Sequence, residues 1–275
     1  MRIFVASWFF PPSTSSEGIV AYKLLKNSTH EYEVCSAVSN QWGYNETIAM
    51  TADNIKQFLV ETDNINEWVE EAISIFEREH ERKPYDAIMT RSMPPESIDV
   101  AKAIKEKHPG LPWIASLGDP ISRVPWMTKC YITNNKNLTK SEKESLRNAL
   151  NAPRPCTEWV NSKDKNVRTL ARYKNWEMEA LRNADLVITP SASQLSFMLC
   201  GMRRNNAVAI GHSYDPSLYP GQGSAAPRNN LTEMVFLGYA SDDRTLVPSS
   251  RHCTHFREPI RTPLPNFASG SSAIS

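Results

Sequence analysis

The chain is poor in glycine, with 10 glycines among 275 residues, roughly half of what average usage gives. Glycine-rich loop chemistry must therefore be sparse. Cysteine is also scattered: the five cysteines form no C-x-x-C pair. This pattern predicts reduced, partly buried thiols in a cytosolic protein.

No charge of one sign dominates the chain, and no long apolar run is present. The formal net charge is +1, so no global field draws the chain to nucleic acid or to a membrane. No stretch approaches the roughly 20 apolar residues of a membrane span. The apolar start Ile3–Phe10 could imitate a signal peptide, but Pro11-Pro12 follows it and a cleavage region is lacking. We therefore interpret it as a buried first strand.

Residues 85–120 organise the rest of the chain. They predict a strand at Ala87–Met89, a helix opened by a pair of prolines, and a second strand at Trp113–Ala115. A strand–helix–strand unit of this length predicts a right-handed parallel crossover. Ligands of such sheets bind beyond the carboxyl ends of the strands. This rule points to Thr90–Ser92 and Ser116–Asp119.

The alternation of strands and helices continues on both sides of this unit. A strand at residues 2–10 precedes a helix that includes Gly18, and Asn64–Arg82 is the clearest helix, with an apolar stripe on one face. The other predicted elements are Tyr32–Val38, Ile55–Val60, Asp164–Asn183, Asp185–Thr189, Ala192–Leu199 and Asn206–Ile210. The predicted fold class is α/β, with a Rossmann-like, doubly wound, mostly parallel sheet.

Two segments have more than one interpretation. Backbone N–H groups where the first helix begins, at Glu17 and Gly18, could receive an anion, or the loop could be a plain turn from strand to helix.

The segment 121–164 is long and polar, and loops of this kind are functional or contain a short helix. Lys140–Leu150 fits a helix. The aromatic residues of this segment could line an acceptor pocket, but we favour surface helices packed on the sheet edge. Those residues are Trp126, Tyr131 and Trp159.

The alternation ends near residue 219. Residues 220–232 are rich in Pro, Gly, Ala and Asn, which predicts an interdomain linker. Met234–Leu237 predicts a strand, so we expect residues 233–248 to begin a second domain. Residues 249–275 have no apolar period of 2 or 3.6 and predict an irregular tail that cannot bury one face.

Several segments, taken in order, resemble a glycosyltransferase of family 4, which has the two-domain GT-B fold. Residues 85–120 are similar to its "pDvi…lPwi…rDp" region, and WEMEALRNADLVITPS at 176–191 is similar to its "E…AD.vit.S" signature. HSYDPSLY at 212–219 resembles its hinge loop, and MVFLGYASDDRTLVP at 234–248 resembles the first strand of its donor domain. The resemblance covers residues 1–248 and rests on the order and spacing of these motifs.

The resemblance implies transfer of a sugar from a nucleotide-sugar donor to a glycan or lipid-linked acceptor, without a metal and without nucleic acid. The leaving diphosphate needs fixed N–H dipoles and cations; the resemblance places Glu17, Gly18 and Arg244 there. Residues 1–219 would be the acceptor-side domain, and Asp119 could hold the acceptor hydroxyl as the catalytic residue, or cap the next turn. The expected acceptor-binding residues are Arg91, Ser92, Ser116 and Gly118. Polysaccharide assembly in the cytoplasm, or at the inner surface of a membrane, is implied by resemblance alone.

Three departures limit these expectations. Only Gly18 stands where the family often has Gly-Gly, Gly118-Asp119 stand where many members have His-Asp, and no E-x7-E pair follows Arg244. A donor domain needs roughly 150 residues and only about 40 remain. We therefore expect a truncated donor domain, with the reading frame lost near Pro248, and a chain inactive alone. The alternatives are an acceptor-binding subunit completed by a separate donor-domain chain, and an unrelated nucleotide-binding Rossmann module.

Overall fold

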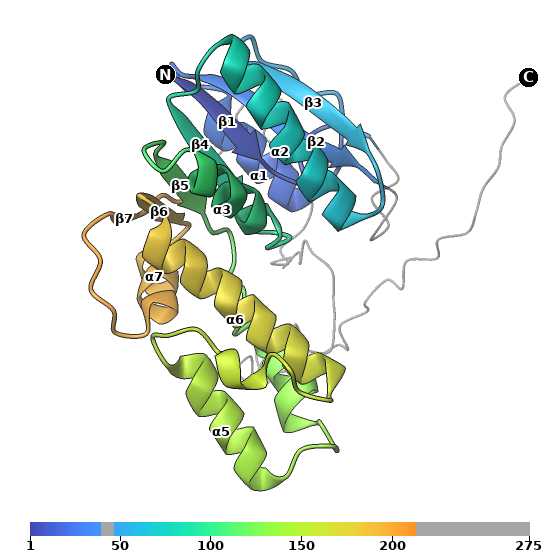
Figure 1. Ribbon diagram of the computed structural model, residues 1–275, viewed down its shortest axis with the longest axis vertical. Coiled ribbons are helices and arrows are strands. Elements are labelled where there is room, and N and C mark those ends of the chain that lie inside the picture. The colour runs from blue at the N-terminus through green and yellow to red at the C-terminus, as the bar shows by residue number, and fades with distance from the viewer. Residues whose placement is uncertain (40–46, 213–275) are drawn as a thin grey trace, which may run out of the picture. The chain divides into compact units, whose positions relative to one another are not determined.

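A computed structural model describes residues 1–39 and 47–212 of the chain (Figure 1). The chain divides into two compact units, Met1–Ala225 and Ala226–Ser275, and all described residues belong to the first. Arg244, the expected linker, the expected start of a second domain and the expected tail lie outside the described residues. The predictions made for them therefore stay predictions.

The described part of the chain is built on a seven-stranded sheet with the order β3-β2-β1-β4-β5-β6-β7. Every neighbouring pair is parallel, which confirms the predicted α/β class. The strands are β1 (Arg2–Ala6), β2 (Glu31–Val38), β3 (Ile55–Glu61), β4 (Ala87–Arg91), β5 (Trp113–Ser116), β6 (Leu186–Thr189) and β7 (Ala207–Ala209). The strand order reverses between β1 and β4, and in sheets of this kind ligands bind in the crevice at the carboxyl ends of the strands near such a point.

Helices follow the strands in the order that the sequence predicts. The α-helices are α1 (Ser16–Leu25), α2 (Ile65–Arg82), α3 (Ser97–Lys107), α4 (Pro125–Met127), α5 (Lys140–Asn151), α6 (Lys165–Asn183) and α7 (Ala192–Leu199), with a π-helix η2 (Thr128–Thr133) and a 3-10 turn η3 (Thr157–Trp159). Side-chain caps set several helix starts: Asn64 accepts from the Asn66 N–H at 3.0 Å and opens α2. Asp164 likewise accepts from Asn166 N at 2.9 Å and opens α6.

One helix begins later than the sequence predicts. The prolines at 94 and 95 were expected to open α3, but the helix begins at Ser97. The Ile98 N–H bonds the Pro95 carbonyl and the Asp99 N–H bonds the Glu96 carbonyl, each at 3.0 Å. These bonds span three residues, so the prolines lie in a turn that precedes the α-helical bonding.

Two apolar cores cover the two faces of the sheet, as a doubly wound fold requires. Alternate residues of β1 point to opposite faces: Phe4 and Ala6 pack with α2, α3, α6 and α7, while Ile3 and Val5 pack with α1. Figure 1 shows α2 and α3 on one side of the strands and α1 on the other. Both cores continue past the carboxyl ends of β1 and β5, where Trp8, Leu117 and Ile121 belong to one core and Phe10 to the other.

The long polar segment forms a helical lobe, defined here as residues 125–172. The lobe has an apolar core of its own, made by Met127, Ile132, Leu146, Leu150, Val167 and Leu170. The C-terminal half of α6 instead joins the core of the sheet. Trp126 is 41 % exposed, whereas Tyr131 and Trp159 pack against the core of the lobe. Surface helices are thus confirmed, but the helices of the lobe pack on one another and on α6 rather than on the sheet edge (Figure 1).

Gly18 lies where α1 crosses the chain that follows β1. A Cβ atom at this position would lie 2.9 Å from Phe10 Cα and 3.0 Å from Phe10 N, and backbone cannot move aside as a side chain can. We expect Gly18→Ala to lower the free energy of unfolding by about 1–3 kcal/mol. Urea denaturation measures this, with Gly110→Ala as the control because no atom lies within 4 Å of its added Cβ. Equal stability of the two variants would contradict the packing role of Gly18.

A candidate binding site at the carboxyl edge of the sheet

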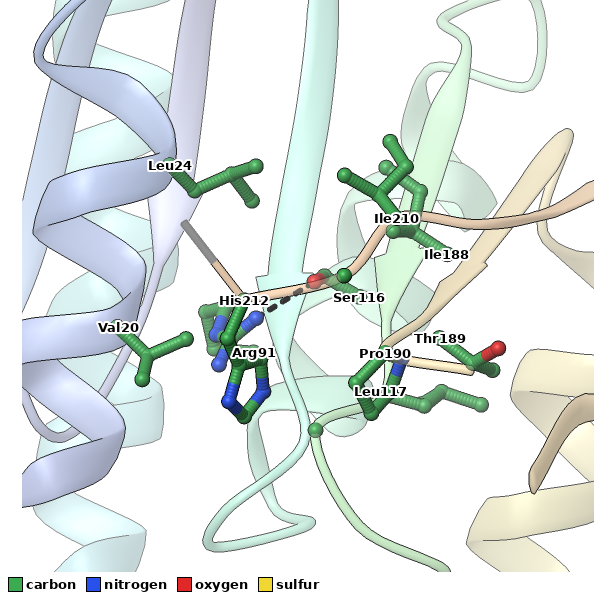
Figure 2. Close-up of a pocket in the computed structure, with 12 residues that line it drawn as sticks. Val20, Leu24, Arg91, Ser116, Leu117, Ile188, Thr189, Pro190, Ile210 and His212 are labelled. Atoms are coloured by element: carbon green, nitrogen blue, oxygen red, sulfur yellow. Dashed lines mark hydrogen bonds between the residues drawn. The ribbon is translucent and has the colours of Figure 1, made fainter. Parts of the chain in front are cut away.

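A pocket opens at the carboxyl ends of β4, β5, β6 and β7, beside α1 (Figure 2). Its polar lining includes Arg91, Ser116, Thr189 and His212. Its apolar lining includes Val20 and Leu24 from α1 and Ile188 and Ile210 from the opposite side. The pocket therefore lies at the edge of the sheet to which the strand ends of the sequence point.

A buried ion pair joins α1 to the sheet at this pocket. Arg91 is 4 % exposed, and its Nη2 donates to Glu17 Oε1 at 2.6 Å. Its Nη1 donates to Ser116 Oγ at 2.7 Å, the bond drawn in Figure 2. The parallel register places Arg91, the last residue of β4, directly beside Ser116, the last residue of β5. The Nε–H of Arg91 is buried without a hydrogen-bond partner among the described residues, so the guanidinium has unused donor capacity.

The carboxyl of Glu17 is tuned by its surroundings. Burial raises the pKa of Glu17 above its ordinary value, Arg91 opposes this shift, and the nearby carboxylate of Asp119 adds to it. Glu17 is in the first turn of α1, where the helix dipole favours a negative charge. The result is a carboxyl that gains a proton more readily than a solvated glutamate and that is bonded to Arg91 of the pocket lining.

Gly118 is the residue that lets Glu17 approach the sheet. A Cβ atom on Gly118 would lie 2.8 Å from Glu17 Oε2. The Gly118 N–H donates to Ser92 Oγ at 3.2 Å, and Gln194 Nε2 donates to the Gly118 carbonyl at 3.2 Å. The loop after β5 is therefore held from two sides, and it presents Asp119 as an exposed residue.

Most of the residues predicted for the site converge in the structure. Glu17, Arg91, Ser116 and Gly118 lie in mutual contact. Ser92 is fully buried and supports Gly118, while Gly18 and Asp119 flank the group, and Arg244 is outside the described residues. The acceptor-binding, donor-binding and catalytic roles given to these residues stay predictions.

Sequence reasoning missed three residues of this region. Thr189 and His212 line the pocket, and Gln194 holds the loop after β5. Thr189 is the last residue of β6, so the rule that found Thr90–Ser92 and Ser116–Asp119 would also have found it. No sequence pattern points to Gln194, because its hydrogen bonds to the carbonyls of Leu117 and Gly118 depend on how α7 packs.

Behind the site, a buried carboxylate holds the chain that follows Asp119. Glu177 of α6 is completely buried and accepts from the N–H groups of Ile121 and Ser122 at 3.0 and 3.1 Å. It also accepts from Ser122 Oγ at 3.0 Å and lies 3.5 Å from Arg123 Nη2 and 3.7 Å from Lys174 Nζ. This glutamate belongs to the WEMEALRNADLVITPS motif. Its contacts explain why a glutamate is suited to this position of the motif: it holds the chain that follows Asp119.

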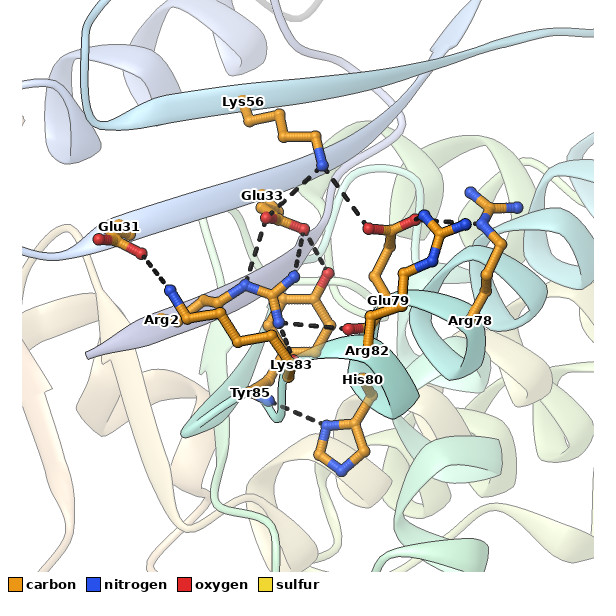
Figure 3. Close-up of polar contacts among 10 residues, drawn as sticks. All are labelled: Arg2, Glu31, Glu33, Lys56, Arg78, Glu79, His80, Arg82, Lys83 and Tyr85. Atoms are coloured by element: carbon orange, nitrogen blue, oxygen red, sulfur yellow. Dashed lines mark hydrogen bonds and ion pairs between the residues drawn. The ribbon is translucent and has the colours of Figure 1, made fainter.

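A second polar cluster lies at the opposite, amino end of the strands (Figure 3). Arg2 Nη2 pairs with Glu33 Oε2 at 2.9 Å, and the Tyr85 hydroxyl donates to the same oxygen at 2.6 Å. Arg2 also donates to the carbonyls of Glu79 and Lys83 at the end of α2. Because these charges are satisfied by one another and by backbone carbonyls, we interpret the cluster as a structural link between β1, β2 and α2.

One histidine of this cluster makes folding sensitive to pH. Nδ1 of His80 accepts from the Tyr85 N–H at 3.0 Å. Burial, and then the neighbouring charges of His108 and Arg2, lower the pKa of His80, while Glu77 opposes the shift. The unfolded chain therefore binds this proton more readily than the folded protein, so stability falls as the pH decreases through the ordinary histidine value of about 6.5.

We expect His80→Asn to remove this dependence, because an amide oxygen can still accept from the backbone but does not titrate in this range. The measurement is the urea midpoint from about pH 7.5 to about pH 5.5, a window around the ordinary histidine pKa. The variant should show a shallower slope than the wild-type protein. An unchanged slope would contradict the assignment.

Two classes of site are not found within the described ranges 1–39 and 47–212. No group of three or more His, Cys, Asp and Glu side chains is placed to hold a metal ion. No helix there has both the length and the apolar character that crossing a membrane requires. The cysteines at 35, 130, 156 and 200 are free thiols, and burial raises the pKa of Cys35 to about 12.

No protein-family model and no curated protein sequence matches the chain. Solved structures that it resembles include a UDP-glucosyltransferase from Polygonum tinctorium capable of glucosylating indoxyl, at 10 % identity and a TM-score of 0.43, covering 82 % of this chain and 55 % of that one. Os79 from O. sativa in complex with UDP gives 12 % identity and a TM-score of 0.45, covering 85 % and 56 %. UDP-N-acetylglucosamine 2-epimerase from Rickettsia bellii gives 14 % and 0.39, covering 77 % and 45 %.

This chain spans about half the length of those structures. Likenesses this distant do not establish the chemistry of the chain. What its own residues define is a class: an α/β protein with a parallel sheet, a reversal of strand order, and a pocket at the carboxyl edge lined by a buried ion pair.

Proposed function

We propose that the described residues form the acceptor-side lobe of a glycosyltransferase similar to family 4. The reaction would transfer a sugar from a nucleotide-sugar donor to a glycan or a lipid-linked acceptor. The observation that carries the proposal is the buried Arg91–Glu17 pair beside Ser116 at the mouth of the pocket. The order of the sequence motifs gives the reaction class.

The lining suits a sugar in its chemical character. A sugar presents hydroxyl groups, which both donate and accept, together with apolar C–H faces. Asp119, next to Gly118 of the lining, offers an exposed carboxylate as an acceptor, and Arg91 in the lining has an Nε–H that finds no hydrogen-bond partner among the described residues. Val20 and Leu24 of α1 supply an apolar wall, as ligand pockets with a few placed polar groups require.

Within this proposal Asp119 holds the acceptor hydroxyl, and the carboxylate accepts its proton as the hydroxyl attacks the donor sugar. Glu17, Gly18 and Arg244 would face the departing diphosphate. The Glu17–Arg91 pair is electrically neutral, so cationic help for that charge has to come from elsewhere, as expected of Arg244. A donor-binding lobe would complete the cleft. Alternatively, the chain is an acceptor-binding subunit whose partner chain supplies that lobe.

The proposal is tested by binding to an array of oligosaccharides and short-chain glycolipids. We expect at least one ligand, and Asp119→Asn should weaken its binding by roughly tenfold or more, because a hydrogen bond to a charged group contributes about 1.5–3 kcal/mol. Asp53→Asn is the matched control, because Asp53 is an exposed carboxylate that precedes β3 at the amino end of the sheet. Equal binding by both variants would overturn the site.

The same experiment separates the proposal from a nucleotide-binding Rossmann module. A thermal shift of the wild-type protein with a UDP- or GDP-sugar, without any glycan ligand, would favour the nucleotide-binding module. Glycan binding without such a shift would favour the acceptor-side lobe.

A further inference from the structure

The helical lobe concentrates positive charge that the net charge of the chain conceals. Residues 125–172 hold ten Lys and Arg against four Asp and Glu, a net charge of +6, whereas the whole chain carries +1. The rest of the chain is therefore acidic on balance. A local excess of this size in a nearly neutral protein points to one surface with its own partner.

Five of the ten cations of the lobe lie on η2, on the chain that follows it, and on α5. The exposed side of α4 and η2 carries Trp126, Lys129, Cys130 and Thr133. Two cations of α5 reach this side: Lys143 Nζ donates to the Thr133 carbonyl at 3.0 Å, and Arg147 Nη2 donates to Thr133 Oγ1 at 3.1 Å. The basic face, as we define it, consists of Lys129, Lys136, Lys140, Lys143 and Arg147 with Trp126.

Three of the four acidic side chains of the lobe are engaged in helix caps or in an ion pair. Glu142 accepts from the Thr139 N–H at 2.8 Å in the cap of α5, and Asp164 caps α6. Glu158 pairs with Arg154 at 3.1 Å, and it lines a separate hollow together with Glu144. The four acids therefore leave the lobe with an excess of six positive charges.

An aromatic side chain stands at the border of the basic face. Trp126 is 41 % exposed and is held edge-on against Tyr131, with ring centroids 5.6 Å apart. Pro125 beside it is also exposed. A fixed, amphipathic indole ring next to several lysines is the arrangement that seats a protein at the headgroup level of a membrane.

We infer that the basic face docks the protein on an anionic membrane surface. A cluster of four to eight Lys and Arg is enough for attraction to acidic headgroups. A membrane meets a single face of the protein, so the acidic remainder of the chain can stay away from it. A long nucleic acid would extend past the lobe toward that acidic remainder. The inference rests on the lobe alone and stands whether or not the pocket binds a sugar.

Co-sedimentation with vesicles tests this inference. We expect the wild-type protein to bind vesicles of phosphatidylcholine with about 30 % phosphatidylglycerol at low salt. It should dissociate from them at about 0.5 M NaCl, because surface charges are then screened. It should not bind vesicles of pure phosphatidylcholine. Lys136→Glu/Lys140→Glu should weaken binding by at least about tenfold, and Trp126→Ala should weaken it by about threefold to tenfold. Lys102→Glu/Arg203→Glu is the control, because both residues are exposed outside the lobe and the charge change is identical.

Three results would overturn the inference. The first is equal binding to neutral and anionic vesicles, or binding to neither. The second is an equal loss in the lobe variant and in the control variant, which would make net charge the cause. The third is binding to a nucleic-acid duplex, in place of vesicles, that the lobe variant abolishes; the basic face would then be a nucleic-acid surface.

Discussion

Arg91→Met is expected to lower the free energy of unfolding by about 3–5 kcal/mol at neutral pH, the usual cost of removing one partner of a buried ion pair. Glu17, only 15 % exposed, would be left with a charge and without its guanidinium. Ser116 would lose a hydrogen bond as well. Chemical denaturation at pH 7 measures the loss.

The pH dependence of this variant identifies the cause. Without Arg91, the pKa of Glu17 would rise further, because burial already raises it and Arg91 opposes that shift. The folded variant would then bind a proton more readily than its unfolded chain, so its stability should fall as the pH rises above the ordinary glutamate value of about 4.3. Arg91→Met/Glu17→Gln should recover much of the loss.

A surface ion pair gives the matched comparison. Arg154 and Glu158 are spaced i,i+4 and lie 3.1 Å apart, with 59 % and 38 % of their side chains exposed. Arg154→Met should change stability by less than about 0.5 kcal/mol, because solvent screens an exposed pair. An equally small effect at Arg91 would show that the pair in the pocket is as weakly coupled as a surface pair, and would contradict our description of the site.

Glu177→Ala is expected to be comparably severe, with a loss of about 3–5 kcal/mol. The change would strip the N–H groups of Ile121 and Ser122 of their acceptor. It would also leave Lys174, fully buried, without its carboxylate, although burial lowers the pKa of Lys174 and part of the charge can be lost with its proton. Denaturation with urea measures the total effect.

A second readout locates the damage. Hydrogen exchange should increase in peptides that cover residues 119–123, which Glu177 fixes. Glu179→Ala is the control on the same helix, because Glu179 is only half-buried and bonds Asn183 within α6. If Glu177→Ala unfolds no more easily than this control, Glu177 does not hold the loop after Asp119.

Local pattern was sufficient to predict the class of fold. The alternation of apolar strands with helices that carry an apolar stripe predicted the parallel sheet. Polar residues at the ends of the strands indicated where a pocket would form. The residues Arg91 and Ser116 were found in this way, because parallel strands end at one edge. Their contact follows from the register between β4 and β5.

Long-range contacts could not be predicted in the same way. Glu17 and Arg91 are 74 residues apart in the chain, and no local spacing predicts that they pair. Glu177 belongs to the WEMEALRNADLVITPS motif, yet nothing in the motif predicts that it is completely buried or that it holds the chain after Asp119. His80 stacks on Phe76 with ring centroids 5.0 Å apart and bonds the Tyr85 N–H, and the pattern of the helix predicts neither contact. Such omissions arise wherever burial depends on a partner from another element.

The most direct test of the binding site is hydrogen exchange of the purified protein with and without the strongest ligand from the glycan array. We predict slower exchange, on ligand binding, in the peptides that contain Ser116–Asp119 and Ile188–Pro190, and no change at the amino edge near Glu33. Protection confined to other surfaces, or none at a saturating ligand concentration, would contradict a sugar site at the carboxyl edge of the sheet.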